Sequence, residues 1–240
     1  MDGISVHEAR RQMGLELAES LRDSCKSNRT SSHAVDVVVP VPETSFVAAN
    51  ALAQRLDIPL EFGLAKSRYS TRTFIMSKQE QRRKAVWRKL TAVAEVVRGR
   101  NVLLVDDSIV RGTTSQEIVR LVRKAGAKSV CFASASPAIR HGHIYGIDLA
   151  QPCSLIANGR SDAQVADAID CDRVVYLEPD ALKRALRRAR VAPHAPMDFE
   201  IGVFTGVYAT PGAQEYLCAA ANKALVAEIR RVDSALAVTG

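Results

Sequence analysis

Short apolar runs rich in valine recur along the chain, and a polar loop follows each of them. The clearest of these runs are Val35–Val39, Val102–Val105, Val130–Ser134 and Val174–Leu177. Runs of this length with apolar residues at consecutive positions are typical of parallel strands that are buried on both faces. Segments with helical spacing separate the runs, so the pattern predicts an α/β fold with a mostly parallel sheet flanked by helices.

Apolar residues at intervals of three and four positions predict helices between these strands. The first helix is expected to begin at Ser5, because Glu8 follows three residues later as in a capping box. The other predicted helices cover Val47–Leu56, Gln79–Leu90, Gln116–Gly126, Ser161–Ile169 and Ala181–Val191. Ile58–Leu64 is expected to be another short strand, and Val93–Val97 a short extended segment.

The chain changes character after Pro179. A strongly basic helical segment is followed by Pro193 and Pro196, which end it, and one more helix is expected near Gln214–Arg231. We therefore predict a main domain over residues 1–190 and a helical C-terminal appendage over residues 191–240 that packs on the same domain.

Composition narrows the class of protein. Among 240 residues, 47% are apolar and no run is long enough to span a membrane, which is typical of a soluble globular protein. The first residues lack the pattern of a secretory signal, and the five cysteines are scattered without a CxxC pair, so the expected compartment is the cytoplasm. The charge of +7 is dispersed and no nucleic-acid-binding signature accompanies it, so a small polyanionic substrate is favoured over nucleic acid.

The most informative stretch is Asn101–Ser115, which reads NVLLVDDSIVRGTTS. A buried strand ends at Asp106 and Asp107, and a loop of small and hydroxylated residues then leads into a helix. This layout binds phosphate because free N–H groups and the positive end of the helix dipole meet at the helix start. Gly112 allows close approach of the backbone, and the hydroxyls that follow it can donate hydrogen bonds to phosphate oxygens.

The two carboxylates of Asp106 and Asp107 would repel a bare phosphate. They suit a ligand that also carries hydroxyl groups, or one that brings a divalent cation, and a phosphorylated sugar offers both. The alternative is an ordinary strand–turn–helix with solvated acids, which the order of strand, acid pair and hydroxylated loop disfavours.

Two other loops are candidate anion sites. Glu43–Ser45 follows the first strand and precedes a helix, where open α/β sheets bind ligands, although these residues could also merely cap that helix. Lys66–Ser77 has no periodicity and is rich in phosphate-binding donors, although it could also be a solvated basic loop. His141 and His143 have no third ligand at a metal-binding spacing.

The stretch VLLVDDSIVRGTTS resembles the signature of type I phosphoribosyltransferases, which bind phosphoribosyl pyrophosphate (PRPP). Four more segments resemble the phosphoribosyltransferase half of the amidophosphoribosyltransferase family, also called glutamine PRPP amidotransferases: Pro40–Ser45, Lys66–Ile75, Arg82–Lys84 and Tyr145–Asp148. The likeness extends from about Ile4 to Phe204–Thr210. It implies a type I phosphoribosyltransferase fold, PRPP as substrate, Mg²⁺ as cofactor and a place in purine biosynthesis and nucleotide metabolism.

The resemblance also implies roles for individual residues. The residues expected to bind PRPP are Glu43, Thr44, Ser45, Asp106, Asp107, Ser108, Val110, Arg111, Gly112, Thr113, Thr114 and Ser115. Those expected beside magnesium are Thr44, Asp106 and Asp107. Lys66, Arg68 and Arg72 are the expected catalytic cations, on a flap that closes over PRPP and excludes water. Ser67 stands where the family usually has asparagine.

Family enzymes begin with a glutaminase domain whose N-terminal cysteine releases ammonia from glutamine. The first cysteine of this chain is Cys25, and Val203 stands where some members have a cluster-binding cysteine. We therefore expect PRPP to react with ammonia, with ammonia from a separate glutaminase subunit, or with another small amine. The expected product is 5-phosphoribosylamine or a related compound, and the chain is expected to form a homo-oligomer. An amine phosphoribosyltransferase of specialised metabolism and a non-catalytic PRPP- or nucleotide-sensing regulator remain alternatives.

Overall fold

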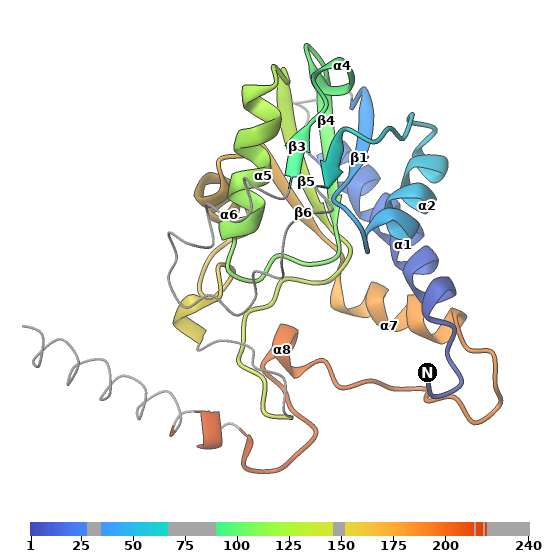
Figure 1. The fold of residues 1–240 in the computed structure, drawn as a ribbon. Helices are drawn as coiled ribbons and strands as arrows, with labels where there is room; N and C mark the ends of the chain where they lie inside the picture. The colour runs from blue at the N-terminus through green and yellow to red at the C-terminus, as the bar shows by residue number, and fades with distance from the viewer. Residues whose placement is uncertain (28–34, 67–89, 146–151, 214, 218, 220–240) are drawn as a thin grey trace, which may run out of the picture.

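The computed structural model describes the whole chain except residues 28–34, 67–89, 146–151, 214, 218 and 220–240 (Figure 1). The strands are β1 (Val37–Pro40), β2 (Leu64–Lys66), β3 (Leu90–Ala92), β4 (Asn101–Asp106), β5 (Ser129–Ser134) and β6 (Arg173–Tyr176). The helices are α1 (Val6–Ser27), α2 (Phe46–Leu56), α4 (Ala94–Val97), α5 (Thr113–Lys124), α6 (Asp162–Ile169), α7 (Pro179–Arg188) and α8 (Gly202–Thr205), with a 3₁₀ turn at Pro152–Ser154.

The main sheet has four parallel strands in the order β1-β4-β5-β6, which confirms the predicted parallel sheet. Pro40 lies beside Val105, and Asp106 lies beside Ser134, so the carboxyl ends of β1, β4 and β5 reach the same edge. A separate antiparallel pair, β2 and β3, brackets the segment 67–89. Loops after parallel strands gather at one edge of the sheet, and this is where a ligand site is expected.

Apolar side chains from the two faces of the sheet pack into two layers. On one face Leu104 and Phe132 lie in the cluster that includes Ile118 of α5 and Ile169 of α6. On the other face the cluster contains Leu103, Leu17 of α1, Leu52 of α2 and Leu182 of α7. Figure 1 shows α5 and α6 on one side of the sheet and α1 and α2 on the other. Helices on both faces explain why the central residues of the strands are apolar at consecutive positions.

The packing of α1 depends on a glycine and a buried carboxylate. A Cβ at Gly14 would overlap the backbone of Ala48, so glycine is needed where α1 crosses closest to α2. Glu16 is buried, and its carboxylate accepts hydrogen bonds from Arg184 (2.7 Å) and Arg188 (2.6 Å) of α7. A buried charge is stable only when it is paired in this way, so these contacts clamp α7 against α1.

The start of α1 shows half of the predicted capping box. The Ser5 hydroxyl accepts the N–H of Glu8 at 3.2 Å, as expected of an N-terminal cap. The Glu8 carboxylate instead accepts hydrogen bonds from Arg11 and Gln12. The N–H of Ser5 donates to the carbonyl of Ala189 at 3.0 Å, so the end of α7 takes the bond that Glu8 would have received.

Two predicted extended segments are wrong in detail. Ala94–Val97 forms one helical turn rather than a strand, and β3 lies just before it, where it pairs with β2. Within Ile58–Leu64 only Leu60 bridges to the sheet, at Val38. Apolar runs this short carry no periodicity that separates a strand from a turn of helix, so their packing decides.

The start of one helix differs from its prediction, and some predicted helices fall largely outside the described residues. Helix α5 begins at Thr113, three residues before the predicted start, because Gly112 already provides its cap. Most residues of the two helices predicted at 79–90 and 214–231 lie outside the described residues. Residues 191–213 contact the rest of the chain: the N–H of Val191 donates to the carbonyl of Gly3, and the carbonyl of Val203 accepts the N–H of His141. The division into a domain and an appendage stays a prediction. Across the described ranges no helix is long and apolar enough to cross a membrane.

Candidate functional site

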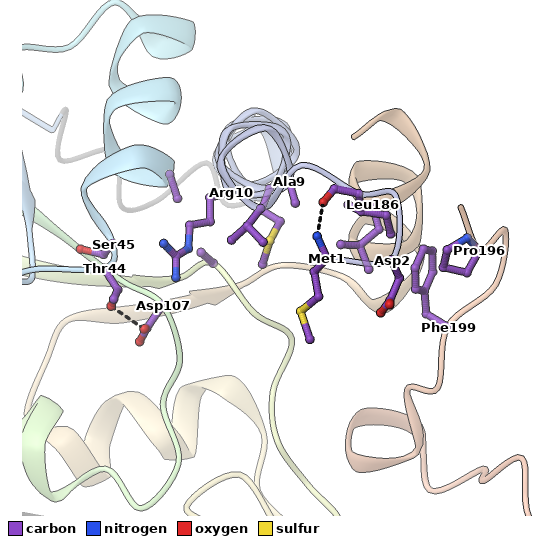
Figure 2. Close-up of a pocket in the computed structure, with 15 residues that line it drawn as sticks. Met1, Asp2, Ala9, Arg10, Thr44, Ser45, Asp107, Leu186, Pro196 and Phe199 are labelled. Carbon is purple, nitrogen blue, oxygen red and sulfur yellow. Dashed lines mark hydrogen bonds between the residues drawn. The ribbon is translucent and has the colours of Figure 1, made fainter. Parts of the chain in front are cut away.

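The loops that follow β1 and β4 start side by side. The N–H of Val41 donates to the carbonyl of Val105 at 2.8 Å, which continues the pairing of the two strands to their last residues. Beyond this point the Thr44 hydroxyl donates to a carboxylate oxygen of Asp107 at 2.7 Å (Figure 2). Two groups that are 63 residues apart in sequence, and that were each predicted to bind PRPP, therefore touch.

The short loop after β1 is tied down by its own side chains. The buried Ser45 hydroxyl donates to the carbonyl of Val41 at 2.5 Å and makes no capping bond to α2. Glu43 is exposed and pairs with Lys66 of β2, with the Nζ and Oε2 atoms 3.3 Å apart. The loop thus presents Glu43 and Thr44 to solvent and uses Ser45 to hold its shape.

The two acids at the end of β4 differ in environment. Burial and the neighbouring Asp107 carboxylate raise the pKa of Asp106 to about 8. A hydrogen bond of 2.8 Å from the N–H of Asp107 to Asp106 offsets only part of this effect. The side chain of Asp107 is exposed. Hydroxyl donors or a cation would reduce the repulsion between these two carboxylates. A magnesium-bound sugar phosphate provides both.

The predicted phosphate loop connects β4 to α5, and contacts with Ile156 support it. Ile109 is buried, and the carbonyl of Val110 accepts the N–H of Ile156 at 2.9 Å. Gly112 has a φ of +75° and caps α5, and a Cβ at this position would overlap Ile156 Cδ1. Only glycine combines this left-handed backbone with the lack of space.

Helix α5 begins at the end of this loop. Its first residues are Thr113, Thr114 and Ser115, of which Thr114 is exposed and Ser115 is buried. No side chain caps the helix, so its first N–H groups are available to an anion. Ser108 is partly buried and Arg111 is exposed on the same loop.

Of the three predicted catalytic cations, the structure describes Lys66 alone. Arg68 and Arg72 belong to the segment 67–89, which lies outside the described residues. Lys66 ends β2 and contacts Glu43, so the base of the predicted flap is next to the predicted pyrophosphate loop.

A cavity of about 390 Å³ extends away from the Thr44–Asp107 contact. It runs beneath α1 to the first residues of the chain, and its walls are largely apolar (Figure 2). Its lining includes Met13, Leu186 and Phe199, and one cationic side chain, that of Arg10. Sequence reasoning missed Arg10, although a glycine four residues later, at Gly14, indicates that this face of the helix packs closely against a neighbour.

The donors at this edge fit magnesium. Asp106, Asp107 and Thr44 offer only oxygen atoms, the ligand type that Mg²⁺ prefers. Within the described ranges no group of three or more His, Cys, Asp or Glu side chains could hold a metal by itself. Mg²⁺ usually keeps substrate and water oxygens among its ligands, so two carboxylates and a hydroxyl are a sufficient protein contribution.

Comparison with known proteins agrees with this geometry. A family model described as the phosphoribosyl transferase domain matches residues 14–142. The amidophosphoribosyltransferase of Schizosaccharomyces pombe is 44% identical over 217 residues, which cover 90% of this chain and 39% of that protein. The enzyme of the same name from Escherichia coli is 44% identical over 210 residues, covering 88% of this chain and 40% of that protein.

A solved structure is similar over the same region. Glutamine PRPP amidotransferase from Bacillus subtilis, complexed with ADP and GMP, superposes with a TM-score of 0.70 at 39% identity, covering 89% of this chain and 44% of that one. The chain thus spans about two fifths of the length of the relatives it matches. The fold predicted from the resemblance is confirmed, and the chain belongs to the phosphoribosyltransferase family, with amidophosphoribosyltransferases among its relatives.

Proposed function

We propose that this chain transfers the 5-phosphoribosyl group of PRPP to ammonia, giving 5-phosphoribosylamine and pyrophosphate. The observation that carries the proposal is the Thr44–Asp107 hydrogen bond, which joins the loops after β1 and β4 beside the start of α5. A ligand at this junction meets carboxylates, hydroxyls and free N–H groups together. The identity of 44% to amidophosphoribosyltransferases supports the choice of ammonia as acceptor.

Each part of PRPP has a matching group in this arrangement. The start of α5, with Thr113–Ser115, binds the 5-phosphate through N–H and hydroxyl groups. Asp106 and Asp107 accept hydrogen bonds from the ribose hydroxyls. Glu43 and Thr44, in the loop that Ser45 holds in shape, face the pyrophosphate together with the cations Lys66, Arg68 and Arg72.

The reaction is a substitution at the anomeric carbon of ribose. The bond from this carbon to the pyrophosphate oxygen breaks, and its electron pair leaves with pyrophosphate. The nitrogen lone pair of ammonia forms the new C–N bond, and a proton then passes from nitrogen to solvent. The protein supplies no nucleophile, so its contribution is to hold the sugar, stabilise the leaving charge and exclude water.

Magnesium, when bound, would be held by Asp106, Asp107 and the Thr44 hydroxyl together with substrate oxygens, and it would neutralise charge on the leaving pyrophosphate. The chain's own cations act on the same charge from the other side. Guanidinium groups suit this task because they bind two phosphate oxygens at once.

The test is pyrophosphate release from PRPP by the purified 240-residue chain. We expect release with ammonium salts and none with glutamine, because no predicted site residue provides a nucleophile for glutamine hydrolysis. The reactive species is neutral ammonia, so at fixed total ammonium the rate should rise about tenfold per pH unit near neutrality. An Asp107→Asn variant is the negative control, and an Arg187→Ala variant on the exposed face of α7 should keep full activity.

Other outcomes identify other functions. A rate that depends on glutamine with the purified chain alone would contradict the proposal. A reaction with another amine but none with ammonia, detected by mass spectrometry of the products, would indicate a phosphoribosyltransferase of specialised metabolism. Tight PRPP binding without turnover of any amine would indicate a sensor.

A further inference from the structure

Arg10 of α1 is exposed and lines the same cavity as Thr44 and Asp107. Figure 2 shows its guanidinium extending from α1 beside these two side chains. Among the described residues that line this cavity, Arg10 contributes the only cationic side chain. An arginine in a largely apolar cavity that ends at a substrate site is a candidate ligand for an anionic group.

The packing of α1 on α2 determines where Arg10 lies. Both helices run away from the carboxyl-terminal edge of the sheet (Figure 1), and they are closest at Gly14 and Ala48. Arg10 lies four residues before Gly14 and therefore on the same face of α1. Ala48 lies in the first turn of α2, directly after the Glu43–Ser45 loop, so the contact that requires glycine places Arg10 on the side of α1 that faces this loop.

Several other arginines on and beside α1 are engaged in ion pairs. Arg11 binds Glu8 at 2.8 Å, Arg55 binds Glu19 at 2.7 Å, and the Arg184 and Arg188 guanidinium groups bind Glu16. Within the part of the chain that the structure describes, Arg10 has no hydrogen-bond or ion-pair partner. Its guanidinium is therefore available to a ligand without breaking an existing contact.

The charges around the site call for an additional cation. Glu43, Asp106 and Asp107 are acidic, the described cation Lys66 is already paired with Glu43, and the described cation Arg111 lies on the loop that is assigned to the 5-phosphate. A pyrophosphate group bound beside Thr44 needs donors that bridge its oxygens, and the planar guanidinium fork is better suited to this than a lysine ammonium.

We propose that Arg10 is a further substrate-binding residue that contacts the pyrophosphate group of PRPP and stabilises it as it leaves. This inference rests on the proposed function, since it takes PRPP as the ligand. It assigns a role to α1, which lies outside the sequence motifs of the site, and it makes the start of that helix part of the pyrophosphate subsite.

The experiment measures binding of PRPP, pyrophosphate and ribose 5-phosphate by calorimetry in the presence of magnesium. For Arg10→Ala we expect affinity for PRPP and for pyrophosphate to fall about 10- to 100-fold, the usual effect of losing a hydrogen bond between charged groups. Affinity for ribose 5-phosphate should stay within about twofold, because the 5-phosphate binds at α5, away from Arg10.

Two further variants serve as controls. Arg11→Ala removes the neighbouring arginine, which is paired with Glu8, and should bind all three compounds as wild type does. Arg10→Lys keeps the charge but not the fork, so it should recover only part of the pyrophosphate affinity. The thermal unfolding midpoints of the two Arg10 variants should equal that of wild type, because the Arg10 guanidinium has no hydrogen-bond or ion-pair partner among the described residues.

The outcomes separate this inference from the proposed function. If wild type turns over PRPP and Arg10→Ala binds pyrophosphate as tightly as Arg11→Ala does, the role of Arg10 is wrong and the function stands. If wild type binds pyrophosphate but not PRPP, the function is wrong and the pyrophosphate affinities of the variants still decide the role of Arg10. An equal loss of ribose 5-phosphate and pyrophosphate binding in Arg10→Ala would also contradict it.

Discussion

The loops after β1 and β4 lie side by side, yet they are held in different ways. The loop after β4 is held by its backbone and by buried contacts: Gly112 has a left-handed backbone, Ile109 is buried, the carbonyl of Val110 accepts the N–H of Ile156, and a 12-residue helix begins at the end of the loop. The loop after β1 is short and exposed, and two of its contacts reach distant partners, from Thr44 to Asp107 and from Glu43 to Lys66.

This difference matches what each loop is proposed to bind. The 5-phosphate stays on the sugar throughout the reaction, so a site held by backbone and buried contacts suits it. Pyrophosphate must be bound and then released, and a loop held by exposed side-chain contacts can respond to its arrival and departure. Exposed contacts of this kind contribute little to stability, so they can exchange without unfolding the domain.

The largest expected effect comes from Gly112→Ala, which changes the rigid loop. The new Cβ would overlap Ile156, and alanine is strained at a φ of +75°, so we expect a loss of about 2–4 kcal/mol in the free energy of unfolding. Affinity for PRPP should fall with it, because the start of α5 would move. Chemical denaturation and calorimetry measure the two effects.

Two companion variants separate the causes of that loss. Gly159→Ala has a similar φ of +65° but no neighbour near its Cβ, so it should show the backbone cost alone, about 1–2 kcal/mol. Replacing Ile156 by valine removes the overlapping Cδ1 atom, so Gly112→Ala should cost less in that background than in wild type. Its cost should still exceed that of Gly159→Ala, because Cγ1 of residue 156 and Cγ2 of Ile169 remain 3.2 Å from the new Cβ. An unchanged cost in the double variant would mean that overlap with Ile156 is not the cause.

The next effect concerns the carboxylate that joins the loops. Asparagine at position 107 can still accept the Thr44 hydrogen bond but carries no charge, so Asp107→Asn tests charge alone. We expect PRPP affinity in magnesium to fall about 10- to 100-fold. Adding EDTA should weaken binding by wild type and have little effect on the variant. Equal affinity of wild type with and without EDTA would contradict a role for the metal.

Adjacent residues of the pyrophosphate loop should give opposite results. Ser45→Ala removes a buried hydroxyl that donates to Val41, so it should cost about 1 kcal/mol of folding free energy. Thr44→Val removes an exposed contact and should change stability little while weakening PRPP binding. Denaturation midpoints and PRPP titrations of both variants make this comparison, and equal stability losses would show that Thr44 also supports the fold.

The smallest expected effect on the free energy of unfolding comes from the ion pair between Glu43 and Lys66. Both side chains are substantially exposed, 75% and 43% respectively, so Lys66→Met should change the free energy of unfolding by less than about 0.5 kcal/mol. Its catalytic effect should be much larger, because Lys66 also faces pyrophosphate. A stability loss above 1 kcal/mol, measured by the same denaturation assay, would place Lys66 in the fold rather than the site.

Much of the fold and of the phosphate loop follows from the sequence alone. The run Val102–Val105 predicted β4, and the glycine and hydroxyls after Asp107 predicted a loop that leads into α5. These signals are local: a buried strand, a left-handed glycine and a helix start each depend on residues within a few positions of one another. The capping box at Ser161 and Gln164 is equally local, and the helix expected there begins one residue later.

Other features depend on packing between distant parts of the chain. Ala94–Val97 forms a helical turn directly after β3, and no periodicity within this short apolar run separates a strand from a helical turn. Thr44 reaches Asp107 only because β1 and β4 are neighbours in the sheet. Arg10 and Arg11 are identical residues in adjacent positions, and no local pattern says which of them faces the site. Helix α1 settles this by packing on α2 through Gly14 and on α7 through Glu16, and these contacts together determine which side of the helix points toward the cavity.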